Sequence, residues 1–146
     1  MSRLQLALNV ENLDTAIAHY SKLFGVEPAK VKPGYANFAI VNPPLKLVLF
    51  ENPGATDSIN HLGVEVESVD EVRSEHDRVV GAGLPTWVEG ETTCCYAVQD
   101  KFWVEGGAHK FEVYTVLADA EQMSNTPKSE ICCAPTAQDV TLTTRP

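Results

Sequence analysis

The sequence is poor in basic residues and has no long apolar run. Lys and Arg number 11 against 20 Asp and Glu, for a formal net charge of -9 at pH 7. Because no basic cluster offsets this field, which repels a phosphate backbone, we expect no nucleic-acid partner. No apolar stretch reaches the roughly 20 residues of a membrane helix. Residues 1–5 form no apolar signal region, so we expect a cytoplasmic protein without a membrane partner.

The sequence also lacks the spaced cysteines of a disulfide framework. Its four cysteines form two adjacent pairs, Cys94-Cys95 and Cys132-Cys133. A bridge within either pair would be strained, because neighbouring Cα atoms lie only about 3.8 Å apart. A bridge between the pairs is geometrically allowed, although a cytosol disfavours it. Two adjacent thiolates suit a soft metal or metalloid, whereas four-thiolate zinc sites usually space their cysteines by two to four residues.

An internal repeat organises the rest of the chain. QLALNVENLDTAIAHYSKLFG, starting at Gln5, aligns without a gap to HLGVEVESVDEVRSEHDRVVG, starting at His61. Each copy alternates apolar and polar residues and then changes to a helical period, which predicts a strand followed by a helix. Asn12 and Ser68 are expected to cap the two helices at their N-termini. Gly25 and Gly81 stand where left-handed C-caps are expected.

Strand-like stretches follow each predicted helix, so each half is interpreted as a βαβββ module. The predicted fold class is α+β, with two modules forming a concave, barrel-like sheet and the helices outside. Residues 1–117 form one domain, with modules at about 1–54 and 58–117. Gln99-Asp100-Lys101 is expected to be a turn between strands. Residues 118–146, which carry the second cysteine pair, have no periodicity and are interpreted as a flexible tail.

Three polar side chains are expected to point into the concavity. If each helix covers the leucine face of its first strand, Gln5 and His61 point inward from equivalent places in the two modules. Glu112 joins them if Phe111 and Val113 pack under the second helix. An imidazole, a carboxylate and an amide oxygen would then form a three-ligand set for a metal, a variant of the 2-His-1-carboxylate site of non-haem Fe(II) enzymes. The alternative is that His61 is a hydrogen-bonded core residue.

Cys94 and Cys95 can hold one atom together only if they lie in a loop or at the end of a strand. In a regular strand adjacent side chains point to opposite faces, so the alternative is one buried and one exposed cysteine. The polar run of Glu91, Thr92 and Thr93 before the pair favours the loop. Lys101, at the tip of the expected turn, is interpreted either as part of a lid over a bound ligand or as an ordinary exposed lysine.

The sequence resembles the vicinal oxygen chelate superfamily, which includes glyoxalase I, type I extradiol dioxygenases and fosfomycin-resistance proteins. More closely, it is similar to organoarsenical C–As lyases and the cadmium-induced proteins related to them. The similarity covers about residues 2–119. It is carried by RLQLALNV, KPGYANFAI, PPLKLVLFENPG, NHLGVEVE, TTCCYAVQDKFWV and FEVYTVLAD, of which TCCYAVQDK is the most specific.

This resemblance implies an Fe(II) enzyme that uses O₂ to break the carbon–arsenic bond of trivalent organoarsenicals, such as methylarsenite and reduced aromatic arsenicals, and releases arsenite. By position, Gln5, His61 and Glu112 match the metal ligands. Cys94 and Cys95 match the pair that holds arsenic. Tyr96 and Lys101 are expected beside the substrate. Nickel or another divalent ion is expected to replace iron in crystals.

Two other functions stay open from the sequence. One is glyoxalase-like or extradiol dioxygenase chemistry, in which the cysteine pair plays no part. The other is binding of cadmium or a metalloid without turnover. The sequence also leaves open whether the protein is a monomer or a homodimer, what organic group the substrate carries, and what Cys132-Cys133 does.

Overall fold

Two βαβββ modules share one curled sheet, as the repeat predicts. The computed structural model describes residues 2–124 of the chain. The first module consists of β1 (Arg3–Val10), α1 (Leu13–Phe24), β2 (Lys30–Lys32), β3 (Tyr35–Ile40) and β4 (Leu45–Glu51). The second consists of β5 (Ile59–Glu65), α2 (Val69–Gly81), β6 (Thr86–Cys94), β7 (Ala97–Val104) and β8 (Phe111–Asp119).

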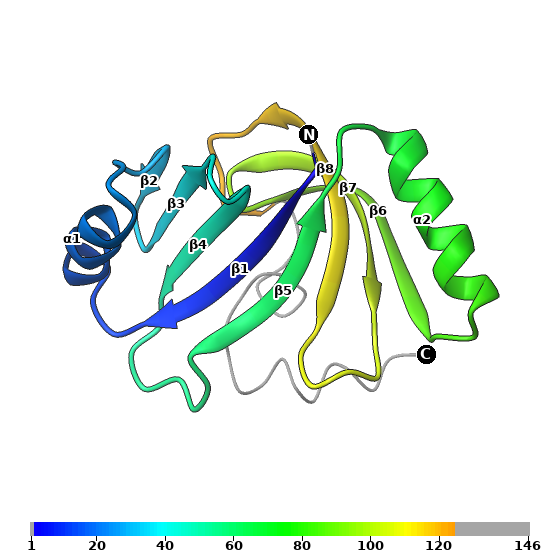
Figure 1. Cartoon of the computed structure of the whole chain (residues 1–146), viewed down its shortest axis with the longest axis horizontal. Helices are drawn as coiled ribbons and strands as arrows, with labels where there is room; N and C mark the ends of the chain where they lie inside the picture. The colour runs from blue at the N-terminus through cyan, green and yellow to red at the C-terminus, as the bar shows by residue number, and fades with distance from the viewer. Residues whose placement is uncertain (1, 125–146) are drawn as a thin grey trace.

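The strands form one eight-stranded sheet in the order β2-β3-β4-β1-β5-β8-β7-β6. Each module closes on its own first strand, because β1 pairs in parallel with β4 and β5 pairs in parallel with β8. The modules join through the antiparallel pair β1–β5. Figure 1 shows α1 and α2 at opposite ends of the curved sheet, on its outer side. The predicted α+β architecture is therefore confirmed.

Strand alternation divides the hydrophobic residues between the two faces of the sheet. Under α1, Phe38, Leu47 and Leu49 belong to a buried cluster, and Leu6 and Leu8 of β1 pack against it. Under α2, Phe102 and Val113 form a second buried cluster with helix residues Val72 and Val79. Because these side chains pack against the helices on the outer face, those of their neighbours along each strand point to the concave face.

The helix N-termini are as predicted, and one of the two C-termini differs. The side chains of Asn12 and Ser68 accept hydrogen bonds from the backbone of the first helical turns. Gly25 adopts the left-handed conformation after α1, with φ of 68°. The prediction for Gly81 is wrong: this residue is still helical, and the left-handed residue is Gly83, with φ of 85°. The second helix therefore includes, as its last residue, the glycine that matches Gly25 in the repeat.

The second module also differs from the sequence prediction in the hairpin of β6 and β7. Gln99, Asp100 and Lys101 do not form a turn, because they lie within β7 and pair with β6. The turn lies at Cys95 and Tyr96 instead. The turn was predicted at these three polar residues, but their side chains alternate along a regular strand, and those of Gln99 and Lys101 are buried.

The chain after the expected domain boundary at residue 117 remains part of the sheet. β8 includes Ala118 and Asp119, and Ser124 forms an isolated bridge with Cys94. The rest of the expected tail, with Cys132 and Cys133, lies outside the described residues. No helix within residues 2–124 is long and apolar enough to cross a membrane.

Candidate active site

Gly63 creates the space in which the predicted ligands meet. It lies in β5, the central strand of three, and pairs with Gln5 on β1 and with Glu112 on β8. A Cβ atom at this position would lie 2.8 Å from Glu112 Cγ and 3.5 Å from Gln5 Nε2. Because glycine has no side chain, the Gln5 and Glu112 side chains extend over it from both sides. His61, two residues earlier on β5, points to the same face.

The three predicted ligands converge on one point, and all three are buried. Gln5 Nε2 lies 2.6 Å from Glu112 Oε1 and 3.1 Å from His61 Nε2. His61 Nε2 and Glu112 Oε1 lie 3.3 Å apart. A carboxylate only accepts hydrogen bonds, so the Gln5 group that faces it is the NH₂. Its oxygen points the other way and accepts a hydrogen bond from the Tyr114 hydroxyl at 2.5 Å.

A buried lysine neutralises the carboxylate of this cluster. Burial alone would raise the pKa of Glu112, but attraction to the Lys101 ammonium and the contact with His61 outweigh it and hold this pKa well below its ordinary value. Lys101 Nζ lies 2.9 Å from Glu112 Oε2. It also lies 5.4 Å from the ring centre of Trp103. Glu112 is therefore ionised, with Oε1 turned to the cluster and Oε2 to the lysine.

A chain of amides determines which nitrogen of His61 carries a proton. Asn9 Nδ2 donates to the backbone carbonyl of Asp57 at 2.9 Å, so Asn9 Oδ1 accepts from Asn60 Nδ2 at 3.1 Å. Asn60 Oδ1 then faces His61 Nδ1 at 2.7 Å and accepts its proton. Burial lowers the pKa of His61 and keeps the ring neutral. Nε2 therefore presents a lone pair to the cluster, as a metal ligand requires.

The donor set fits a divalent cation. His61 Nε2 and Glu112 Oε1 are both acceptors at 3.3 Å from each other, and the partial positive charge of one amide NH₂ lies between them. Exchange of the oxygen and nitrogen of that amide would give three ligands. Within residues 2–124 no group of three His, Cys, Asp or Glu side chains is arranged to hold a metal ion. A site here therefore depends on the amide of Gln5.

The cysteine pair lies at a hairpin turn, which is the arrangement that lets both sulfurs point to one place. Cys94 ends β6 and pairs with Ala97, the first residue of β7. Cys95 and Tyr96 between them have φ of 58° and 60°, as a two-residue type I′ turn requires. This conformation breaks the alternation of a strand, and the two Sγ atoms lie 3.0 Å apart. Cys94 is fully buried and forms a disulfide in this structure, and Cys95 is half-buried.

Contacts from three directions hold this turn. Gln99 Nε2 donates to the Cys94 carbonyl at 2.9 Å, and the Cys95 amide donates to the Met123 carbonyl at 2.8 Å. From the other end of the sheet, Lys30 Nζ donates to the Tyr96 carbonyl at 2.8 Å. The Tyr96 ring lies 5.5 Å from the ring of Tyr35 on β3. The two modules thus touch across the hollow at the cysteine turn.

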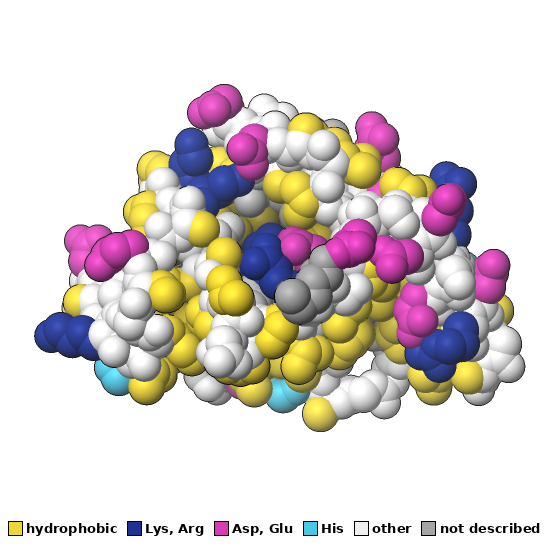
Figure 2. Space-filling model, turned by 45° about the horizontal axis from the view of Figure 1, so that its top comes forward, with side chains coloured by type: hydrophobic (Ala, Val, Ile, Leu, Met, Phe, Trp, Pro, Cys, Tyr) yellow, Lys and Arg dark blue, Asp and Glu magenta, His cyan; other side chains and the backbone are white. Residues whose placement is uncertain are grey.

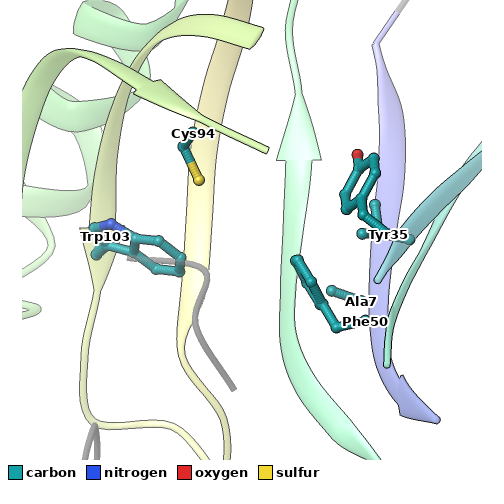
Figure 3. Packing of buried hydrophobic residues seen from close by; sticks show 6 residues of the cluster. Ala7, Tyr35, Phe50, Cys94 and Trp103 are labelled. Atoms are coloured by element: carbon teal, nitrogen blue, oxygen red, sulfur yellow. The ribbon is translucent and has the colours of Figure 1, made fainter. Parts of the chain in front are cut away.

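An apolar wall connects the cysteine pair with the polar cluster. Cys94 and Trp103 of the second module belong to one buried cluster with Ala7, Tyr35 and Phe50 of the first. Figure 3 shows these side chains facing one another across the hollow, with the Cys94 sulfur directed inward. The His61 ring lies 5.3 Å from the ring of Trp103 and 6.3 Å from that of Phe50. Figure 2 shows the hollow itself, with basic and acidic side chains near its centre.

Of the seven predicted site residues, Gln5, His61, Glu112, Cys94 and Cys95 lie around one hollow, and Lys101 lies in a setting that was not predicted. Lys101 is neither a lid residue nor an exposed turn residue. It is a buried side chain on the inward face of β7. The alternation of Gln99, Lys101 and Trp103 along the strand was the available signal. Tyr96 lies in the turn beside Cys95, and its predicted contact with substrate, like that of Lys101, stays a prediction.

Two further residues were missed as parts of the cluster. Asn60 orients His61, and Tyr114 orients Gln5. Tyr114 lies two residues after Glu112 on the same face of β8, as strand alternation places it, but its contact with Gln5 was not predicted. Asn60 carries no such signal, because it is adjacent to His61 and strand alternation predicts that the two side chains point to opposite faces.

Curated relatives cover almost the whole chain. The cadmium-induced protein CadI of Mycobacterium tuberculosis (strain ATCC 25618 / H37Rv) is 56% identical over 91% of this chain and 93% of its own. The trivalent organoarsenical cleaving enzyme of Thermomonospora curvata is 53% identical over 92% of this chain and 90% of its own. A protein of that name from Bacillus sp. (strain MD1) is 38% identical over 94% and 93%.

Solved structures of low sequence identity have the same fold. The Mn(II)-bound glyoxalase from Novosphingobium aromaticivorans superposes with a TM-score of 0.59 at 18% identity, over 89% of this chain and 44% of the other. The methylmalonyl-CoA epimerase of Mycobacterium tuberculosis gives 0.52 at 17% identity, over 76% and 85%. The sequence model of the Glyoxalase/Bleomycin resistance protein/Dioxygenase superfamily, which describes this protein family, matches residues 3–106. The chain is therefore a member of this superfamily, also called the vicinal oxygen chelate superfamily, and its fold is the one that the resemblance implied.

Proposed function

We propose that this protein cleaves the carbon–arsenic bond of trivalent organoarsenicals in a reaction that needs Fe(II) and O₂ and releases arsenite. The observation that carries the proposal is the cysteine turn. Two sulfurs 3.0 Å apart line the same hollow as an amide, an imidazole and a carboxylate that converge on one point. The names of the relatives at 53% and 38% identity support this reaction.

The cysteine pair suits arsenic that carries one carbon substituent. Such arsenic has two exchangeable oxygens. Once the disulfide of Cys94 is reduced, the thiolates of Cys94 and Cys95 can replace both oxygens while the carbon–arsenic bond stays intact. Arsenic is thiophilic, so the soft sulfurs favour it over hard cations. Because Cys94 is buried in the apolar wall with Trp103 and Tyr35, the organic group would lie against aromatic rings rather than in water.

Gln5, His61 and Glu112 would hold the iron. Fe(II), when bound, supplies the chemistry that activates O₂. The protein's own part is to keep His61 neutral through Asn60, to keep Glu112 ionised through Lys101, and to hold the substrate beside the cluster. Holding both partners in one hollow converts an encounter of separate molecules into a positioned reaction.

The test is arsenic speciation after reduction of the protein with a thiol, anaerobic reconstitution with Fe(II), addition of methylarsenite and exposure to air. We expect inorganic arsenite to appear only when iron and oxygen are both present. Glu112→Gln should abolish its release, and so should the replacement of Cys94 and Cys95 by serine. Glu75→Gln is a matched control, because Glu75 pairs with Arg78 on the outside of α2. Release of arsenite without iron or without O₂ would contradict the proposal.

A binding protein without turnover is the second candidate, favoured by the similarity to proteins named for induction by cadmium. In that case methylarsenite or Cd²⁺ would bind to the cysteines, no arsenite would be released, and Glu112→Gln would have no effect on binding. A third candidate is glyoxalase or extradiol dioxygenase chemistry, supported by the superfamily alone. Such an activity would survive the replacement of both cysteines by serine.

A further inference from the structure

The side-chain amide of Gln5 has its two ends in different surroundings. Its NH₂ lies among acceptors, 2.6 Å from Glu112 Oε1 and 3.1 Å from His61 Nε2. Its oxygen lies 2.5 Å from the hydroxyl of Tyr114. A cation held by the cluster would repel the NH₂ and attract the oxygen. The arrangement on β1 is therefore the one that suits the protein without a metal ion.

To serve as a ligand, the amide of Gln5 must exchange its two ends by rotation about its last side-chain bond. The oxygen would then face His61 and Glu112, and the NH₂ would face Tyr114. A buried NH₂ that loses both of its acceptors needs a new one, because an unsatisfied buried donor is costly. A hydroxyl is suited to this place because it donates in one state and accepts in the other.

Resting on the proposed metal site, we infer that Tyr114 is a positioning residue that makes Gln5 competent as a ligand. Its hydroxyl donates to Gln5 Oε1 when no cation is bound, and it accepts from Gln5 Nε2 when the oxygen turns to the cation. The Tyr114 ring is buried and lies 5.1 Å from Lys46 Nζ and 5.7 Å from Lys101 Nζ. These contacts hold the ring in place while the hydroxyl hydrogen turns.

With Tyr114 beside it, the neutral amide of Gln5 can act where a stronger ligand would be expected. An imidazole or a carboxylate presents lone pairs in either orientation, whereas an amide presents a lone pair at one end only. Such a residue needs a neighbour that accepts its other end. Within residues 2–124, the Gln5 side chain makes one hydrogen bond outside the cluster, and that bond is the one from Tyr114.

The test is a double-mutant cycle read out by Co(II) affinity, with absorption of the bound ion as the signal. The four proteins are wild type, Gln5→Ala, Tyr114→Phe and the double variant. We expect Tyr114→Phe alone to weaken Co(II) binding by about 10- to 100-fold, as loss of an outer-shell partner typically does. In the Gln5→Ala background the same change should have less than about a twofold effect, because the amide that it orients is gone.

Two results would overturn the inference: wild-type affinity in Tyr114→Phe, or an equal loss of affinity in both backgrounds, which would indicate a general effect of the ring. Wild-type protein that binds no Co(II), or Glu112→Gln protein that binds it as tightly as wild type, would overturn the proposed metal site itself. In that event the ¹⁵N resonance of the Gln5 amide in metal-free protein separates the two failures. A change of this resonance between wild type and Tyr114→Phe would show that Tyr114 contacts Gln5, so that only the role of the contact in metal binding would be lost.

Discussion

Lys101 Nζ and Glu112 Oε2 form an ion pair 2.9 Å long on the floor of the hollow, and both side chains are buried. The residues lie on adjacent strands, β7 and β8, where Lys101 is in register with Tyr114 and Trp103 with Glu112. The pair is therefore diagonal across the sheet. It places one positive charge behind the carboxylate and leaves Oε1 available to the cluster.

Lys101→Met should destabilise the protein strongly. Removal of one partner leaves a buried charge without compensation, which costs about 3–5 kcal/mol. We expect the free energy of unfolding, measured with urea, to fall by that amount, and to recover in part when Glu112→Gln is added. Lys22→Met on the exposed face of α1 is the control and should change it by less than about 0.5 kcal/mol. Equal stability of the two lysine variants would show that the buried pair contributes little.

Gly63→Ala should damage both the fold and metal binding. The added Cβ would lie 2.7 Å from the Glu112 carbonyl oxygen, so β5 and β8 must separate, at a cost of about 1–3 kcal/mol for overpacking. Gly81→Ala is a matched control, because nothing lies within 4 Å of its Cβ position and alanine favours a helix. Urea unfolding and Co(II) titration would show the difference. A Gly63→Ala protein with wild-type metal affinity would mean that the ligands do not depend on this gap.

Asn60→Leu should weaken metal binding without removing a ligand. Without Asn60 Oδ1 at 2.7 Å, the proton of His61 is no longer held on Nδ1, and loss of such a partner reduces metal affinity about 10- to 100-fold. Asn60→Asp keeps an acceptor and should retain most of the affinity. Isothermal titration with Co(II) distinguishes the two variants. If leucine and aspartate have the same effect, the amide chain from Asn9 does not orient the histidine.

Protonation of Glu65 should account for part of the decrease in the free energy of unfolding at acid pH. Burial would raise the pKa of Glu65, but Lys46 and Arg3 outweigh it and hold this pKa below its ordinary value. The unfolded chain therefore binds a proton more readily than the folded one. The stabilisation is complete above the unfolded pKa of about 4.3 and is lost as the pH falls through the folded value.

Glu65→Gln isolates this contribution. The variant should be less stable than wild type at pH 7, by on the order of 1 kcal/mol, as is typical of partly exposed ion pairs. The difference should shrink toward zero near pH 3. Urea midpoints at the two pH values measure it. A difference that is the same at both would show that Glu65 acts through packing rather than through charge.

The positions of most candidate site residues were predictable because strand alternation and the repeat are local signals. Gln5 and His61 are equivalent positions of the repeat, and β1 and β5 pair with each other, so their side chains meet near the axis between the modules. The inward direction of Glu112 was predicted from the outward packing of Phe111 and Val113, and both residues do pack under α2. Each inference needed only the face of a strand and no distance.

The remaining features depend on contacts that no local pattern carries. The turn at Cys95 and Tyr96 has positive φ at two residues that rarely adopt it, so a polar tripeptide four residues later was taken for the turn. The buried position of Lys101 depends on Glu112, which is supplied by the next strand. The amide chain through Asn60 depends on the loop carbonyl of Asp57.

The most direct test of the central claim is a crystal structure of the protein with a divalent metal ion and a trivalent aromatic arsenical, with both elements located by anomalous scattering. The account predicts the metal in contact with Gln5 Oε1, His61 Nε2 and Glu112 Oε1. It also predicts arsenic bonded to the sulfurs of Cys94 and Cys95 in the same hollow. A metal bound away from these three side chains, or arsenic held at another surface, would contradict it.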